Sequence, residues 1–314
     1  MEKPLISIIL PAYNHENYVE ETIRSILCQT WPNLELLVID DGSRDHTWDV
    51  LQKCKPECEK HLARVFMERQ QNQGTCVTMN RLVAESRGKY LFDIASDDVI
   101  ADRETIELEA DFLETHSDYV LAVGNNDMID ENSKKIAWDN HCNAVEIGTE
   151  ESYADMASYI YGTGLSQYSP DYFGTYKSFL RGKFIPNGYL IRRSALPQDP
   201  VFPAEAPAED WYLMFQLAKA GRMKYIDRIL YHYRWHRGNT SKKEYHMQDM
   251  RYRTWCYERK LLKREGRTEY LKLLEQQPCL HPLNYTARCM LHPLAERVRK
   301  ILHLPSHEGA GKKS

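Results

Sequence analysis

The chain has 314 residues, of which 42% are hydrophobic and 27% are charged. This length suits one large α/β domain, or one such domain with a smaller appendage, and the hydrophobic fraction is sufficient for a core. With 41 Lys and Arg against 45 Asp and Glu, the formal net charge is -4. The chain as a whole therefore has no basic field of the kind that holds nucleic acid through its phosphates, and we expect no nucleic-acid partner.

No segment of the sequence predicts export or a membrane span. The apolar run at residues 5–10 is too short for the core of a signal peptide, and Pro-Ala-Tyr-Asn follows it. No apolar run reaches the roughly 18 to 20 residues that a spanning helix needs. We therefore expect a cytoplasmic protein with reduced cysteines. Cys54, Cys58 and His61 share one face of a predicted helix, and we interpret them as packing residues, not as a zinc site.

Strand and helix patterns alternate through the first 124 residues. A continuous apolar run with one Ser predicts a buried strand at residues 5–10, a second buried strand is predicted at 34–39, and further strands are predicted at 64–67, 90–94 and 119–124. Apolar residues at helical spacing predict helices at residues 18–28, 47–54, 77–86 and 102–115. This alternation is typical of βαβ units, so we expect an α/β fold with a Rossmann-like, mostly parallel central sheet and helices on both faces.

The pattern weakens in the second half of the chain. No regular pattern is clear from residue 125 to 183, and Gly, Ser and Tyr are frequent around residues 159–176. This composition predicts either a long connection that shapes an acceptor site or a mobile surface insertion. Regular patterns return from residue 184 to 192, and the sequence then predicts a helix at 209–220 and a strand-like segment at 225–235. Beyond residue 239 the sequence predicts helices almost to the end.

Polar side chains follow the first, second and fourth predicted strands. They are Tyr13-Asn14, Asp40-Asp41 and Ser96-Asp97-Asp98. Because ligands of open parallel sheets bind beyond the carboxyl ends of the strands, we expect the three clusters on one rim. Asp97 and Asp98 offer the carboxylate oxygens that Mg²⁺ or Mn²⁺ prefers. An acidic pair of this kind also suits a turn that caps the next helix.

The three polar clusters belong to a longer series of short motifs, which follow one another over residues 5 to 240. They are SIILPAYN from residue 7, SILCQT from residue 25, ELLVIDDGS from residue 35, NQG from residue 72 with Asn80, GKY from residue 88, ASDD from residue 95, EDWYL from residue 209 and YRWH from residue 233. Together they resemble the family-2 glycosyltransferases with a GT-A fold. Each motif is weak by itself, and the ordered set is specific.

The resemblance implies a donor site for a nucleotide-sugar. Pro11, Ala12 and Tyr13 would line the nucleoside pocket, Asp41 would bind the base edge with Asp40 beside it, and Asp97 would contact the ribose or diphosphate. The other residues expected to contact the donor are Asn14, Gly74 and Asn80. The planar ring of Tyr13 can stack on a base. Each cluster has a simpler interpretation, since Asp41-Gly42-Ser43 is also a common turn.

The resemblance also implies the metal and catalytic residues. Asp98 would bind the divalent metal, which His236 would approach from the C-terminal side. Asp210 would be the general base that deprotonates the acceptor hydroxyl, and its neighbour Glu209 could exchange roles with it. Many members of the family have an acid where this chain has Ala95, so only two acids of the usual three are present.

The expected function is inverting, metal-dependent transfer of a hexose from a UDP-sugar. The acceptor would be a hydroxyl of a glycan, or of a glycan on a polyprenyl diphosphate, in surface polysaccharide synthesis. Two alternatives remain open. One is a non-catalytic nucleotide-sugar binding module, and the other is a nucleotidyltransferase on a similar sheet, which would want a Gly-rich, Lys-bearing loop after the first strand.

These inferences predict a domain organisation. Residues 1–240 would form the GT-A domain, with a nucleotide-binding half at 1–124 and an acceptor half at 125–240. Residues 241–306 would form a helical extension, followed by a disordered tail at 307–314. Within the extension, residues 280–304 combine an apolar face with Arg and Lys. They suit either a basic helix on the inner face of the cytoplasmic membrane or a helix packed on the domain.

Overall fold

The computed structural model describes residues 3–162, 168–198, 200–239, 242 and 244–277. The chain divides into two compact units, residues 1–254 and 255–314. Helix α8 (Glu244–Arg264) begins in the first unit and ends in the second, where α9 (Thr268–Glu275) follows it. The predicted segment 280–304 and the predicted tail His307–Ser314 lie outside the described residues. No helix in the described part of the chain is long and apolar enough to cross a membrane.

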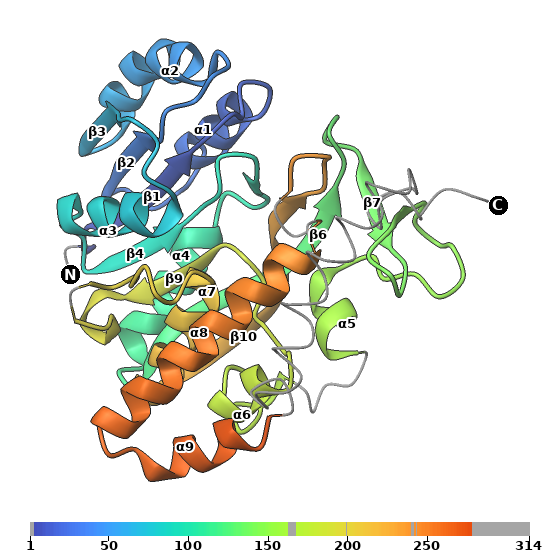
Figure 1. Ribbon diagram of the computed structural model, residues 1–314. Helices are drawn as coiled ribbons and strands as arrows, with labels where there is room; N and C mark the ends of the chain where they lie inside the picture. The colour runs from blue at the N-terminus through green and yellow to red at the C-terminus, as the bar shows by residue number, and fades with distance from the viewer. Residues whose placement is uncertain (1–2, 163–167, 199, 240–241, 243, 278–314) are drawn as a thin grey trace, which may run out of the picture. The chain divides into compact units, whose positions relative to one another are not determined.

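A twisted sheet organises the first unit, and its first strands are parallel. β1 (Ile6–Ala12) pairs with β2 (Leu34–Asp40) on one side and β4 (Tyr90–Asp93) on the other, and β3 (Arg64–Arg69) pairs with β2. These strands lie side by side in blue to cyan in Figure 1. Residues Ile6 to Leu10 and Leu34 to Asp40 are all buried, and the sequence predicts buried strands at 5–10 and 34–39.

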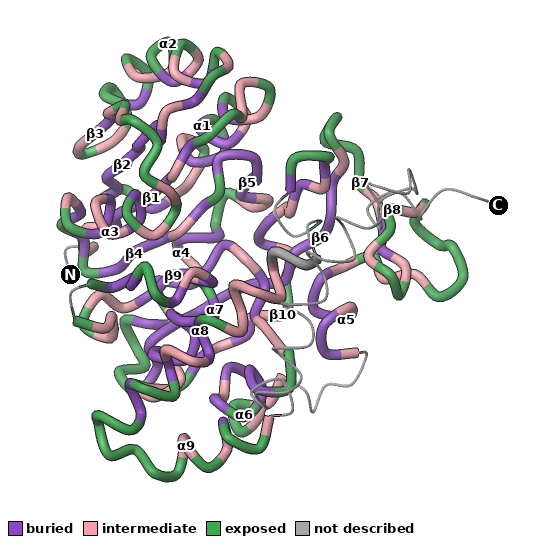
Figure 2. The backbone as a smooth tube through the Cα atoms, in the orientation of Figure 1, coloured by how far each residue is buried: buried purple, intermediate pink, exposed green. Residues whose placement is uncertain are grey.

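Helices cover both faces of this half of the sheet. Ile8 and Leu10 of β1 share a core cluster with Ile23 of α1 (Val19–Leu27) and Leu51 of α2 (Thr47–His61). α4 (Thr105–Thr115) contributes to the same cluster. Successive side chains of a strand point to opposite faces, and α3 (Thr75–Glu85), which contacts β1 and β2, covers the other one. Figure 2 shows these strands as a buried core and the outer side of α2 as exposed. The predicted α/β sheet with helices on both faces is confirmed.

The second half of the sheet departs from a simple parallel order. The strand order is β3-β2-β1-β4-β9-β6-β10-β5, so β9 (Tyr189–Arg192) lies between β4 and β6 (Tyr119–Ile129) and is antiparallel to both. β10 (Arg222–Arg234) follows α7 (Glu209–Ala220) and runs parallel to β6, and its far edge pairs with the short β5 (Val99–Ile100).

The segment with the weak sequence pattern contains regular structure. β6 continues through Asn125, Asn126 and Asp127 to Ile129, five residues past the predicted end. Those polar residues hide the strand pattern, although all three are buried because partners satisfy them. Asn125, for example, donates to Asp155 Oδ1 at 2.7 Å and accepts from the backbone N–H of Ala157 at 3.0 Å. The remaining elements of this segment are β7 (Lys135–Trp138), β8 (Ala144–Val145), α5 (Met156–Tyr161) and α6 (Tyr176–Leu180).

A buried carboxylate ties the amino ends of the first strands together. Glu35 accepts hydrogen bonds from Ser7 Oγ at 2.6 Å and from the backbone N–H of Arg87 at 2.5 Å, and it pairs with Arg64 at 2.8 Å. Burial opposes ionisation of Glu35, but the hydrogen bonds from Ser7 and Arg64 outweigh it and hold the pKa below its ordinary value of 4.5.

We expect Glu35→Gln to lower the free energy of unfolding at pH 7 by about 2 kcal/mol, because a charged acceptor is replaced by a neutral one inside the protein. A carboxyl with a lowered native pKa stabilises the fold above its ordinary pKa and loses that contribution as pH falls through the native value. Urea unfolding of the wild type and the variant at pH 7 and pH 4 measures both effects.

The matched control is Glu20→Gln. Glu20 pairs with Arg24 on an exposed helix face, and solvent screens that pair, so its loss should change stability far less. Equal losses in the two variants would contradict the role given to Glu35.

Candidate active site

Hydrogen bonds hold the three predicted polar clusters together at the carboxyl ends of β1, β2 and β4. The backbone N–H of Asn14 donates to Ser43 Oγ at 2.9 Å, and Asn14 Oδ1 accepts from the backbone N–H of Arg44 at 2.8 Å. Asn14 has a φ of 57°, a left-handed conformation that asparagine tolerates better than most residues. His15 Nδ1 lies 2.8 Å from Ser96 Oγ, which joins the loop after β1 to the loop after β4.

The acids after β2 are engaged by the protein itself. Asp40 is fully buried, accepts from the backbone N–H of Ser43 at 2.9 Å, and pairs with Arg69 Nε at 3.1 Å. Asp41 accepts from the backbone N–H groups of Gln73 at 2.8 Å and Gly74 at 2.9 Å. Gly74 has a φ of 84° and immediately precedes α3. Asp41 therefore shapes the loop that leads into α3, in addition to any contact with a ligand.

The remaining residues expected to bind the donor lie in different settings. Tyr13 is 40% exposed, so its ring is free to stack, whereas Ala12 is buried. Pro11 lines a pocket described below. Asn80 binds protein backbone: its Nδ2 donates to the Phe202 carbonyl at 2.7 Å, and its Oδ1 accepts from the Phe202 N–H at 2.9 Å. Because Phe202 also lines the pocket, Asn80 positions one of its walls.

Asp98 is buried and directed into the protein. Its Oδ2 accepts from the Tyr231 hydroxyl at 3.0 Å, and its Oδ1 accepts from the backbone N–H of Arg234 at 2.8 Å. Burial and the neighbouring charge of Asp97 raise the pKa of Asp98 well above its ordinary range. Thr22 of α1 donates to the Asp98 carbonyl at 2.7 Å, which anchors this loop a second time.

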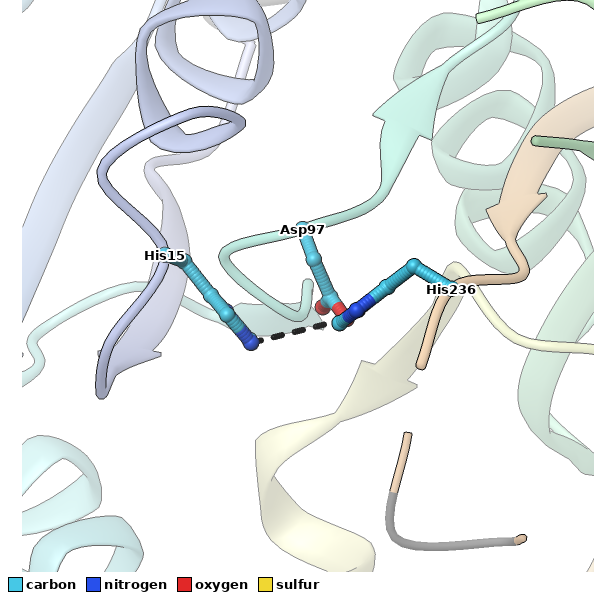
Figure 3. A group of neighbouring side chains, drawn as sticks. All are labelled: His15, Asp97 and His236. Atoms are coloured by element: carbon cyan, nitrogen blue, oxygen red, sulfur yellow. Dashed lines mark hydrogen bonds and ion pairs between the residues drawn. The ribbon is translucent and has the colours of Figure 1, made fainter. Parts of the chain in front are cut away.

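Asp97 points the other way, between two histidines. Its Oδ2 lies 2.8 Å from His236 Nε2 and 3.7 Å from His15 Nε2 (Figure 3). Burial opposes ionisation of Asp97, but the hydrogen bond to His236 and the charge of His15 hold its pKa below the ordinary value. Burial also lowers the pKa of His15, although Asp97 partly offsets this, and a neutral imidazole is the form that binds metals.

The three side chains fit a divalent metal ion. One ligand atom from each of His15, Asp97 and His236 lies within 4.8 Å of the others. Two imidazole nitrogens and one carboxylate oxygen are donors that suit Mn²⁺ and related transition metals better than Mg²⁺. His236 is further held by Asn239, whose Oδ1 accepts from the His236 backbone N–H at 2.5 Å.

A pocket beside this group contains the predicted catalytic acids. Glu209 and Asp210, at the start of α7, line an open cavity of about 210 Å³ together with Asp93 and Ala95. Protein atoms surround both acids, although the pocket leaves Asp210 open to solvent. Burial and the charge of Asp210 raise the pKa of Glu209 to about 8, and burial also raises the pKa of Asp210.

Four residues with clear contacts in this region were not predicted as site residues. They are His15, Asp93, Tyr231 and Arg234. His15 follows Asn14 directly, so its position in the loop after β1 was a usable signal. Asp93 is an acid at the end of an otherwise apolar strand, Tyr90–Asp93, which is a second such signal. Nothing in the sequence shows that Tyr231 and Arg234 reach back more than a hundred residues to the acidic loop.

Comparison of the fold with solved structures gives matches over most of the chain. A crystal structure of residues 1–349 of S. aureus TarS aligns with a TM-score of 0.53 and 18% identity, and it covers 90% of this chain and 74% of that one. Another TarS crystal structure contains UDP-GlcNAc. The mannosyltransferase PcManGT from Pyrobaculum calidifontis, in complex with GDP-Man and Mn²⁺, aligns with a TM-score of 0.59 and 12% identity over 95% of this chain and 81% of that one. At these identities the likeness establishes the fold, which is the predicted GT-A type.

Comparison of the sequence gives relatives at higher identity over shorter spans. The putative teichuronic acid biosynthesis glycosyltransferase TuaG of Bacillus subtilis is 36% identical over 96 residues, which are 31% of this chain and 37% of TuaG. An uncharacterized glycosyltransferase of Nostoc sp. is 28% identical over 239 residues, which are 74% of this chain and 66% of that protein. The chain thus spans less than two thirds of the length of these relatives.

The family model described as "Glycosyl transferase family 2" matches residues 7–184. This range contains the motifs from the loop after β1 to the acidic loop after β4, and it extends over more than half of the chain. The family resemblance seen in the sequence is therefore confirmed, and the chain belongs to glycosyl transferase family 2.

Proposed function

We propose that this protein is an inverting, metal-dependent glycosyltransferase that uses a nucleoside diphosphate sugar, with a UDP-sugar as the expected donor. The observation that carries the proposal is that one loop, the loop after β4, contributes both to the pocket of Asp210 and to the group of His15, Asp97 and His236. Ala95 lines the pocket that contains Asp210, and Asp97, two residues further on, belongs to the group that fits a metal ion. A diphosphate held near Asp97 would therefore place its sugar toward Asp210.

The metal contact in this proposal falls on Asp97, with His236 and His15. The sequence predicts Asp98 with His236 at the metal, but each carboxylate oxygen of Asp98 already accepts one hydrogen bond from inside the protein, from Tyr231 or from Arg234. Asp97 in contrast presents Oδ2 to both imidazoles. A bound Mn²⁺ or Mg²⁺ would supply positive charge to stabilise the diphosphate as it leaves.

Asp210 is the proposed general base. It is the more open of the two adjacent acids, and it faces the same pocket as the sugar in this arrangement. It would accept the proton of the acceptor hydroxyl while the hydroxyl oxygen forms the new bond to the anomeric carbon and the bond to the diphosphate breaks. A single displacement of this kind inverts the anomeric centre and requires no covalent sugar-enzyme intermediate. Glu209, whose pKa is about 8, can hold a proton beside it.

The donor and acceptor classes belong to the proposal as well. TarS binds UDP-GlcNAc and PcManGT binds GDP-Man with Mn²⁺, which supports a nucleotide-sugar donor for this chain. The relationship to TuaG supports an acceptor among surface glycans. A glycan on a polyprenyl diphosphate at the inner face of the cytoplasmic membrane is the acceptor that we propose, with the enzyme in the cytoplasm or attached to that surface.

Measurements of metal binding test the proposed ligands His15, Asp97 and His236. We expect Mn²⁺ to bind more tightly than Mg²⁺ in the presence of UDP, because imidazole nitrogen suits transition metals. His236→Ala and His15→Ala should each weaken Mn²⁺ binding by roughly 10-fold or more, on the scale seen for disturbed metal sites. Isothermal titration and the electron paramagnetic resonance signal of Mn²⁺ measure this directly. His46→Ala, which removes an exposed imidazole outside the site, is the control. Unchanged Mn²⁺ binding in the His236 variant would exclude this ligand set.

The general base is tested by Asp210→Asn. We expect the release of UDP from UDP-sugars in the presence of Mn²⁺ to fall by about 10²- to 10⁴-fold, the usual contribution of a general base, while UDP binding is retained. The base acts ionised and its pKa is raised, so the wild-type rate should fall on acidification at a higher pH than for an ordinary Asp. The rate between pH 4 and 9 measures this.

Asp227→Asn, on an exposed part of β10, is the matched control and should leave the rate unchanged. Donor binding without turnover against any acceptor extract would favour the non-catalytic binding module. Release of pyrophosphate from a nucleoside triphosphate would favour the nucleotidyltransferase.

A further inference from the structure

The charged side chains that line the pocket beside the metal-binding group, among the residues that the structure describes, are all acids. Three of its lining residues are acids, namely Asp93 at the end of β4 and the pair Glu209 and Asp210 at the start of α7. No Lys, Arg or His is present among the described residues that line it. No positively charged side chain among these lining residues therefore offsets the negative charge of the acids when a group binds in the pocket.

Asp93 has no role in the transfer reaction proposed above, yet it faces the same space as the base. The charge of Asp210 acts on it, and the hydroxyl of Tyr189 hydrogen-bonds to it. Burial and Asp210 raise the pKa of Asp93 to about 7, against the opposing effect of that hydrogen bond. Arg251 also acts on Asp210, but Arg251 lies over the ring of Trp211, 4.6 Å from its centroid, and does not line the pocket.

The position of the pocket indicates which part of a substrate it takes. Pro11 belongs to β1, which leads into the loop of Tyr13, and Ala95 belongs to the loop of Asp97. In the proposed donor complex these two loops hold the nucleoside and the diphosphate. The next group along the donor is the sugar, so the sugar ring is the part that lies against Asp93, Glu209 and Asp210.

The chemistry of the lining distinguishes between classes of sugar. A sugar hydroxyl can donate to an ionised carboxylate and can accept from a protonated carboxyl or a tyrosine hydroxyl. A neutral ring therefore suits this pocket whichever of the acids holds a proton. A uronic acid sugar carries an ionised carboxylate, which only accepts, and it would add a fourth acid to three. Carboxylates that share a site disfavour each other's ionised form, so this repulsion opposes binding of such a sugar.

We propose that Asp93, together with Glu209 and Asp210, makes the pocket specific for donors with an uncharged sugar ring and excludes donors of uronic acids. Asp93 is the specificity-determining residue, because it is the acid of the three that is not assigned to proton transfer. The inference rests on the proposed function, since it requires a nucleotide-sugar in this pocket.

The test compares donors that differ in one carboxylate. Binding of UDP-glucose, UDP-GlcNAc and UDP-glucuronate is measured by isothermal titration with Mn²⁺ at pH 8, where a group of pKa about 7 is mostly ionised. We expect UDP-glucuronate to bind about 10-fold or more weakly than UDP-glucose. In Asp93→Asn this ratio should fall severalfold, while the affinity for UDP alone stays the same, and Asp93→Glu should keep the wild-type ratio. GDP-mannose and GDP-mannuronate form a second pair, which makes the result independent of the base.

Asp111→Asn, the same change on an exposed face of α4, is the control and should leave the ratio unaltered. A merely structural Asp93 would weaken the paired donors equally and leave the ratio at its wild-type value, which would overturn the proposal. Equal or tighter binding of UDP-glucuronate by the wild type would overturn it too. Absence of binding by UDP, GDP and all of their sugars would instead refute the proposed function, and the inference with it.

Discussion

The buried guanidinium of Arg234 is the contact on which the geometry of this site depends. Its Nε donates to the Asp97 carbonyl at 2.6 Å, and its Nη2 pairs with Glu21 of α1 at 2.6 Å. Its Nη1 donates to the Asp130 carbonyl and to Ser133 Oγ, in the turn between β6 and β7. A buried cation requires such partners, and here they come from three segments: the acidic loop, α1 and the turn between β6 and β7. Arg234 therefore connects the acidic loop to the first helix and to the far half of the sheet.

This connection gives two adjacent acids different environments. Consecutive residues in a tight loop point in different directions, and the backbone N–H of Arg234 holds Asp98 on the inner side. Asp97 is then left facing His236, which follows Arg234 by two residues on the same strand end. The end of β10 and the residues just after it thus supply the backbone N–H that binds Asp98 and the imidazole that binds Asp97. The ordinary rule that burial and a like charge raise a carboxyl pKa applies to Asp98, and opposite charges outweigh it at Asp97.

The sequence predicts the sheet well and the site partly, for physical reasons. β1 and β2 are buried on both faces, so apart from Ser7 and Glu35 their cores are apolar and easy to recognise. β6 is recognised only to Gly124, because buried Asn and Asp residues follow and their partners lie elsewhere in the sequence, such as Asp155 for Asn125 and His232 for Asp127. The direction of Asp97 and Asp98 is not encoded locally, because it depends on Arg234 and Tyr231. A resemblance between motifs identifies which loops meet, but it does not tell which oxygen of which acid is free.

The antiparallel strand β9 has a consequence for how the domain is completed. It pairs with β4 and β6, which come from the first 129 residues, but it is itself formed by Tyr189–Arg192. A growing chain that has reached residue 184, where the family match ends, still exposes a strand edge of β4 and another of β6. Open strand edges invite pairing with other chains. The strands β4 and β6 thus become parts of one sheet only when the later strand β9 lies between them.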